Sequence, residues 1–168
     1  MLWQRSGGGG RWACVAALLL GVLLAGCGAA PPDAPLSVVA TTAEHRLVRH
    51  AFGETEVPLE PQRILALGEE GLLADLLDGG VRPVAASVNI PDQVPLLSPE
   101  ELAGITLFPS AGEVSLETLS AFQPDLIIGS SFFVEQVGYQ RLAQIAPTVA
   151  IGGGDPLTSY VETLSVLG

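Results

Sequence analysis

Short apolar runs alternate with helical patterns through most of the chain. Residues 63–67, 84–88, 125–129 and 148–151 are nearly continuous apolar segments, and small polar residues or glycines follow each of them. Apolar runs of this length that alternate with helices are typical of a parallel sheet covered on both faces. The pattern therefore predicts an α/β domain with four parallel strands.

Helix signals lie between these runs. They predict helices at residues 71–78, 135–145 and 155–167 and one that starts at Ser115 and is ended by Pro124. A capping box at Ser98-Pro99-Glu100-Glu101 predicts a short helix inside a long loop. Ahead of the first apolar run, residues 45–59 alternate around Phe52-Gly53-Glu54-Thr55, which predicts a β-hairpin. The whole pattern is that of a Rossmann-like sheet with helices on both faces.

Ligands of such sheets bind outside the carboxyl ends of the strands. The residues that follow the four predicted strands are 68–70, 87–89, 129–132 and 152–155, and we expect them to share one edge. Asn89 and Ser131 could donate or accept hydrogen bonds there, and Phe132 could stack on a ligand. These three residues are candidate ligand contacts. Asn89 lies in the loop expected after the second strand, and Ser131 and Phe132 lie in the loop expected after the third.

The first 27 residues have the pattern of an export signal. Arg5 and Arg11 precede an apolar run over residues 13–25, which is shorter than the roughly 20 residues of a membrane-spanning helix. The run ends in Leu24-Ala25-Gly26-Cys27, which resembles the lipobox of bacterial lipoproteins. That resemblance implies removal of residues 1–26 and a lipid anchor on Cys27, at the outer face of the cytoplasmic membrane; an ordinary secretory signal is the alternative. Residues 27–43 are then expected to be a flexible tether.

Composition limits the partners. The 168 residues suffice for one domain, and 48% of them are hydrophobic. The formal net charge is −11, and the chain contains no lysine. Nucleic-acid binding depends on clustered Lys and Arg side chains, so nucleic acid is not an expected partner. Both cysteines, Cys14 and Cys27, belong to the export signal and anchor, so no disulfide is expected.

Three segments carry a family resemblance. PQRILALGEEGLLADLLDGGVRPVAAS, SLETLSAFQPDLIIGSS and RLAQIAPTVAI resemble the amino-terminal lobe of the iron-siderophore and cobalamin class of ABC-transporter substrate-binding proteins. The resemblance covers residues 46–168. It implies a periplasmic-binding-protein fold of two lobes that hold the ligand between them and deliver it to a membrane permease. Residues 44–168 would be one such lobe, and we expect a truncated member without the second.

The resemblance also implies roles for individual residues. Glu117, in the Leu-Glu pair ahead of the PDLII segment, would face arginines of the permease, although a carboxylate is also favoured in the first turn of a helix. Glu69 and Glu70 lie where relatives place pocket residues, and the same helix-start explanation applies to them. The ligand expected first is a ferric siderophore, with haem or cobalamin as alternatives. None of the predicted edge loops carries Arg, Lys, Tyr or Trp, the groups that an anionic ferric catecholate normally needs. The other lobe that the resemblance implies could supply these groups.

Two other function classes fit less well. A nucleotide-binding enzyme could use residues 152–155 as a phosphate cradle, but this segment lacks the G-x-G-x-x-G spacing and the chain has no Walker lysine. A zinc or manganese transport protein needs convergent histidines, whereas His45 and His50 both precede the first core strand. Ser130 and Ser131 have no histidine nearby to act as a base, so no catalysis and no cofactor are expected.

Overall fold

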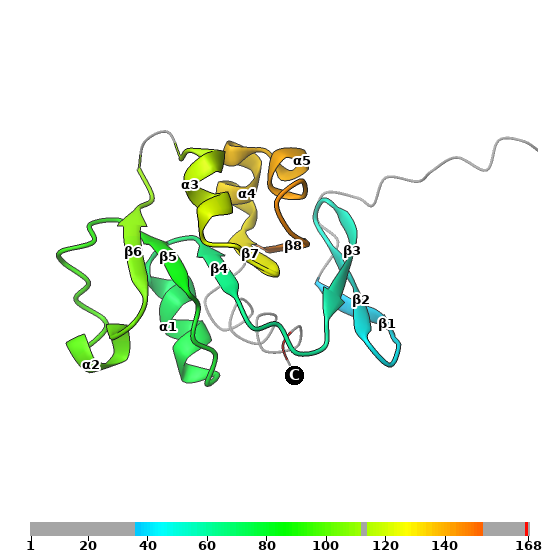
Figure 1. Cartoon of the computed structure of the whole chain (residues 1–168), viewed down its shortest axis with the longest axis horizontal. Helices are drawn as coiled ribbons and strands as arrows, with labels where there is room; N and C mark the ends of the chain where they lie inside the picture. The colour runs from blue at the N-terminus through cyan, green and yellow to red at the C-terminus, as the bar shows by residue number, and fades with distance from the viewer. Residues whose placement is uncertain (1–35, 112–113, 153–166, 168) are drawn as a thin grey trace, which may run out of the picture.

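The computed structural model describes residues 36–111, 114–152 and 167 (Figure 1). It contains two sheets. A three-stranded antiparallel sheet has the order β1-β2-β3, and a five-stranded sheet has the order β6-β5-β4-β7-β8. The strands are β1 (Ser37–Thr41), β2 (His45–His50), β3 (Gly53–Pro58), β4 (Ile64–Leu67), β5 (Ala85–Val88), β6 (Thr106–Pro109), β7 (Leu126–Ser130) and β8 (Thr148–Ile151). The helices are α1 (Glu70–Asp78), α2 (Pro99–Leu102), α3 (Leu116–Ala121), α4 (Ser131–Val137) and α5 (Tyr139–Leu142).

All neighbouring strands of the five-stranded sheet run parallel. The chain lays down β4, β5 and β6 in one direction and then crosses over to add β7 and β8 on the other side of β4. The strand order within this sheet is that of a doubly wound Rossmann fold. Successive strands are added on one side of β4 as far as β6 and on the other side from β7 onward, so the topological switch point lies between β4 and β7. The predicted parallel α/β sheet is confirmed.

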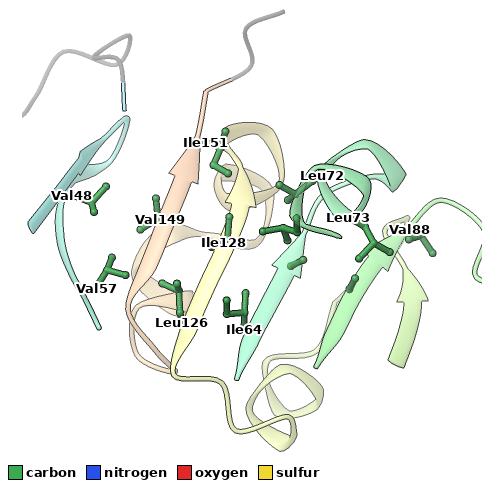
Figure 2. Close-up of a cluster of buried hydrophobic side chains, with 13 residues drawn as sticks. Val48, Val57, Ile64, Leu72, Leu73, Val88, Leu126, Ile128, Val149 and Ile151 are labelled. Carbon is green, nitrogen blue, oxygen red and sulfur yellow. The ribbon is translucent and has the colours of Figure 1, made fainter. Parts of the chain in front are cut away.

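Helices cover both faces of the sheet, as predicted. Alternate strand residues point to opposite faces, so Ile64 and Ala66 pack with the α1 leucines, whereas Leu65 and Leu67 pack with Leu119 of α3. Figure 1 shows α1 on one side of the sheet and α3, α4 and α5 on the other. The cluster on the α1 side continues across the sheet from Val88 to Ile151 and on to Val48 and Val57 of the hairpin (Figure 2).

The predicted hairpin is confirmed by β2 and β3, which pair antiparallel throughout. A buried polar cluster joins this hairpin to the central domain. Thr55 donates its hydroxyl hydrogen to the Thr148 carbonyl at 2.9 Å. Because that hydroxyl has a single hydrogen, His50 Nε2 at 2.8 Å and the Tyr139 hydroxyl at 3.1 Å must both donate to Thr55 Oγ1.

The structure differs from the sequence-based expectations at three places. β1 lies within residues 27–43, where a flexible tether was expected, and pairs with β2. β6 lies in the stretch expected to be a long loop, so the sheet has a fifth strand. The helix expected at 135–145 is two shorter helices, α4 and α5, separated at Gly138, whose φ of 99° interrupts the helical backbone. Apart from Leu167, the expected final helix at 155–167 lies outside the described residues.

Candidate functional site: the carboxyl edge of the sheet

The carboxyl ends of the five parallel strands lie along one edge, hereafter the carboxyl edge. Leu67 at the end of β4 is in register with Gly129 in β7, and Val88 at the end of β5 is in register with Pro109 in β6. Ser130 at the end of β7 is in register with Ile151 of β8. The topology therefore brings together the segments at 68–70, 87–89 and 129–132, as expected from the sequence. Of the expected fourth segment, 152–155, only Gly152 is described.

Glu70 and Asn89 form the most connected polar pair on this edge. The backbone N–H of Asn89 donates to Glu70 Oε1 at 3.0 Å, and the Asn89 side-chain amide donates to Glu70 Oε2 at 3.0 Å. Ser110, which follows β6, donates its hydroxyl hydrogen to Asn89 Oδ1 at 3.1 Å. Three successive strand ends are thereby tied together by one carboxylate, one amide and one hydroxyl.

A pocket of about 440 Å³ opens beside this polar pair. Most of its wall comes from the loop that follows β5, and the lining residues are Glu70, Asn89, Ile90, Gln93, Val94, Pro95 and Leu96. Of these, only Glu70 and Asn89 were predicted as site residues. The others belong to the long loop that follows β5. Loops of this kind commonly carry binding residues, so the position of the loop after a strand end could have identified them in the sequence.

Two glycines permit close packing where the chain changes direction. A Cβ on Gly129 would lie 2.7 Å from Val134 Cγ2 and 3.0 Å from the Leu67 carbonyl oxygen. A Cβ on Gly68 would lie 2.8 Å from Leu72 Cδ2. Helices α1 and α4 can therefore begin directly at the ends of β4 and β7. The Ser87 hydroxyl fixes the junction between β4 and α1. It accepts a hydrogen bond from the Gly68 N–H at 2.8 Å and donates one to the Gly68 carbonyl at 2.9 Å.

The expected Ser130–Ser131 loop is not a loop. Ser130 is the last residue of β7 and caps α4, accepting from the Phe133 N–H at 3.5 Å, and Ser131 is the first residue of that helix. The Ser131 hydroxyl donates to the Ile151 carbonyl at 2.8 Å and so joins β8 to α4. Its hydrogen is already used within the molecule, although its oxygen can still accept a hydrogen bond.

Phe132 is the most exposed aromatic residue described at the carboxyl edge. Its side chain is 67% exposed and meets the ring of Phe133 edge-on at 5.3 Å, while Phe133 packs against the core. Ile90 and Leu96, on the loop after β5, are 52% and 67% exposed. In the described part of the chain five large hydrophobic side chains are exposed, and three of them follow strand ends on this edge.

The remaining predicted residues are distributed as follows. Glu69 is exposed and precedes α1 without capping it through its side chain. Glu117 is exposed in the first turn of α3, nine residues before Leu126, the first residue of β7. Cys27 lies outside the described residues. Within those residues, no group of three or more His, Cys, Asp and Glu side chains is arranged to hold a metal ion, and no helix is long and apolar enough to cross a membrane.

A second pocket of about 400 Å³ lies at the amino edge of the sheet, where β4 and β5 begin. Residues 59–62, 64, 80–82 and 167 line it. It shares no residue with the pocket at the carboxyl edge, so the two can be told apart by experiment.

Comparison with known proteins agrees with this geometry. Residues 61–168 match the family model described as periplasmic binding protein. No curated protein sequence matches the chain.

Solved structures share the fold. SirA of Staphylococcus aureus complexed with staphyloferrin B is 30% identical with a TM-score of 0.57, over 74% of this chain and 42% of that one. A periplasmic solute binding protein of Mycobacterium smegmatis is 28% identical with a TM-score of 0.59, over 74% and 47%. The siderophore periplasmic binding protein from the fuscachelin gene cluster of Thermobifida fusca is 31% identical with a TM-score of 0.51, over 67% and 43%. The chain thus spans less than half of the length of these structures.

Proposed function

This chain belongs to the periplasmic binding protein family, and we propose that it is a substrate-binding component of an ABC importer that captures a ferric siderophore outside the cytoplasmic membrane. Haem-like and cobalamin-like ligands are the alternatives. Two of the structures that are at least 30% identical are a complex of SirA with staphyloferrin B and the siderophore periplasmic binding protein of the fuscachelin gene cluster. The proposed substrate class, ferric siderophores, rests on the similarity of this chain to those two proteins.

The observation that carries the proposal is the meeting of a pocket, hydrogen-bonding groups and exposed apolar side chains at the carboxyl edge. Glu70, Asn89 and Ser110 provide fixed polar groups, and the pocket beside them is large enough for part of a chelate. Apolar pockets with a few oriented polar groups are typical of small-molecule sites. In open α/β sheets such sites lie at this edge.

Two further assignments complete the proposal. Cys27 would carry diacylglycerol after removal of residues 1–26, and two acyl chains suffice for stable anchoring. Glu117, exposed on α3, would pair with an arginine of the permease. Neither role requires catalysis or a cofactor, so the protein would act by binding alone.

The experiment that tests the function is calorimetric titration of the full chain with ferric chelates of several classes. Binding of at least one ferric chelate, with no binding of the iron-free chelator at the same concentration, is the expected result. Absence of binding across all classes, from folded protein, would refute the proposed function.

A further inference from the structure

Resting on the proposed function, we infer that the side-chain amide of Asn89 donates a hydrogen bond to an oxygen atom of the bound chelate, and that Glu70 and Ser110 are positioning residues that act through this amide. The three residues follow neighbouring strands, since β5 lies between β4 and β6 in the sheet (Figure 1). The family resemblance places Glu70 in the pocket, and its hydrogen bonds point to an indirect role there.

Burial separates the three residues. Ser110 is only 4% exposed and does not line the pocket. Glu70 is half-buried and Asn89 is exposed, and both of them line the pocket. A chelate in the pocket can therefore reach Asn89 directly, whereas Ser110 can influence the chelate only through the Asn89 side chain to which it is hydrogen-bonded.

The chemistry of its two partners fixes the orientation of the Asn89 amide. An ionised carboxylate can only accept hydrogen bonds, so the amide nitrogen, and not the amide oxygen, must face Glu70 Oε2 at 3.0 Å. The Ser110 hydroxyl then donates to the amide oxygen at 3.1 Å. Turning the amide by 180° would place its oxygen against a carboxylate oxygen, and neither atom could donate. Glu70 therefore selects one orientation of the amide.

This orientation leaves one donor for a ligand. The amide nitrogen of Asn89 carries two hydrogens, and only one of them is bonded to Glu70. No acceptor for the second hydrogen lies among the described residues. The nitrogen end of the amide is held by Glu70, which lines the pocket, whereas the oxygen end is held by Ser110, which does not. A chelate in the pocket would thus meet an N–H group, whose complement is a carbonyl, carboxylate or iron-bound oxygen.

The same carboxylate also fixes the backbone that carries the donor. Glu70 Oε1 accepts from the backbone N–H of Asn89 at 3.0 Å, at the start of the loop that follows β5. The loop then turns at once, because the Gln93 N–H donates to the Ile90 carbonyl at 2.9 Å. Ile90 and Gln93 line the pocket beside Asn89. A donor that is held before binding loses little conformational freedom when a ligand arrives, so its hydrogen bond contributes more to affinity.

The test is a double-mutant cycle measured by calorimetric titration of the full chain. The probes are an uncharged ferric trihydroxamate, a ferric tricatecholate and a ferric α-hydroxycarboxylate chelate, and the variants are compared with the probe that the wild type binds most tightly. Asn89→Ala should weaken binding by about tenfold, and Glu70→Gln, which keeps an acceptor for the backbone N–H but lets the amide turn, by about three- to tenfold. In the Asn89→Ala background, neither Glu70→Gln nor Ser110→Ala should weaken binding further. Additive losses would overturn the positioning roles, because they would show that Glu70 or Ser110 acts on the ligand independently.

An exchanged pair separates the donor from the structural role of the network. Glu70→Gln combined with Asn89→Asp keeps the net charge, a hydrogen bond between the two side chains and an acceptor for the Ser110 hydroxyl, but it puts a carboxylate where the amide donor was. Unfolding in urea should stay close to that of the wild type, while the affinity for the probe should fall by about tenfold or more. Binding as tight as that of the wild type, here or in Asn89→Ala, would overturn the inference and leave the proposed function standing. A wild type that binds none of the three probes would overturn both.

Discussion

The carboxylate of Glu70 holds Asn89 by two hydrogen bonds of 3.0 Å, one to its backbone N–H and one to its side-chain amide. This pair links the start of α1 to the end of β5 and fixes one wall of the candidate pocket. Because the same carboxylate satisfies the backbone and the side chain of one residue, its loss should release the loop after β5 as a unit.

We therefore expect Glu70→Ala to lower the free energy of unfolding by about 1 kcal/mol, the usual net loss for such bonds at a partly exposed site. Amide hydrogen exchange at Asn89 should become faster. Glu69→Ala is the matched control, because Glu69 is exposed and makes no side-chain cap to α1. If both variants unfold at the same urea concentration, the pair does not stabilise the edge.

The hairpin should depend on the Thr55 hydroxyl. Thr55→Val keeps the shape of the side chain but removes the partner of His50, Tyr139 and the Thr148 carbonyl, all in a buried or partly buried setting. The expected loss of stability is about 2–4 kcal/mol, because several buried polar groups lose a partner at once. Tyr139→Phe, which removes a single donor, should cost about 1 kcal/mol in the same urea titration. A Thr55→Val variant no less stable than Tyr139→Phe would contradict this account.

Stability should also fall in mild acid because of His50. Burial lowers the pKa of His50 from 6.5 to about 4, and its neighbours Thr55, Tyr139 and Phe52 carry no charge near neutral pH. The unfolded chain therefore binds a proton between pH 6.5 and 4 that the folded chain does not. The stabilisation is complete above pH 6.5 and decreases as the pH falls toward 4, by up to about 3 kcal/mol.

Urea unfolding of the wild type and of His50→Gln across this pH range isolates that contribution. The variant should be less stable at pH 7, and the difference between the two proteins should shrink as the pH falls. A difference that stays constant from pH 7 to pH 4 would show that His50 does not titrate in this window.

Close packing at the end of β7 gives a steric prediction. Gly129→Ala would place a methyl group 2.7 Å from Val134 Cγ2 and 3.0 Å from the Leu67 carbonyl, so α4 must move away from the sheet. The expected cost is about 1–3 kcal/mol. Gly71→Ala, in α1, meets nothing within 4 Å and should instead stabilise the protein by about 0.5–1 kcal/mol. Opposite signs in thermal unfolding are the expected result, and a stabilising Gly129→Ala would contradict the geometry.

Docking to a permease is tested separately from ligand binding. Glu117→Arg should lower siderophore uptake in cells by about tenfold, the equivalent of one lost charge-assisted contact, and leave ligand affinity unchanged. Glu100→Arg makes the same charge change at the exposed start of α2 and should leave uptake normal. Uptake that is normal with Glu117→Arg would remove the docking role.

Sequence reasoning found the central strands because burial on both faces leaves a clear signal. Residues 64–67, 85–88, 126–129 and 148–151 are all buried, and each lies in a continuous apolar run. The edge strand β6 was missed because Thr106 and Pro109 at its two ends are exposed and only its middle residues are partly buried. Strand β1 was missed for the same reason, since all five of its residues are exposed.

The candidate site was predictable only in part. Asn89 is the first residue after the buried strand β5 and Glu70 is the third after β4, so the topology of a parallel sheet places them at one edge. Ser110 follows the strand that was missed, and its bond to Asn89 depends on β6 lying beside β5. The Ser130–Ser131 segment was expected to be a loop because two serines follow a glycine, whereas the Ser130 hydroxyl caps a helix that starts without any intervening residue.

The central claim is that the carboxyl edge binds a ferric chelate, and hydrogen exchange with and without an uncharged ferric trihydroxamate tests it most directly. The account predicts slower exchange in residues 89–96 and 130–133, with no change in residues 59–64 and 80–82 around the amino-edge pocket. Protection confined to the amino-edge segments, or bound chelate without any protection at the carboxyl edge, would contradict it.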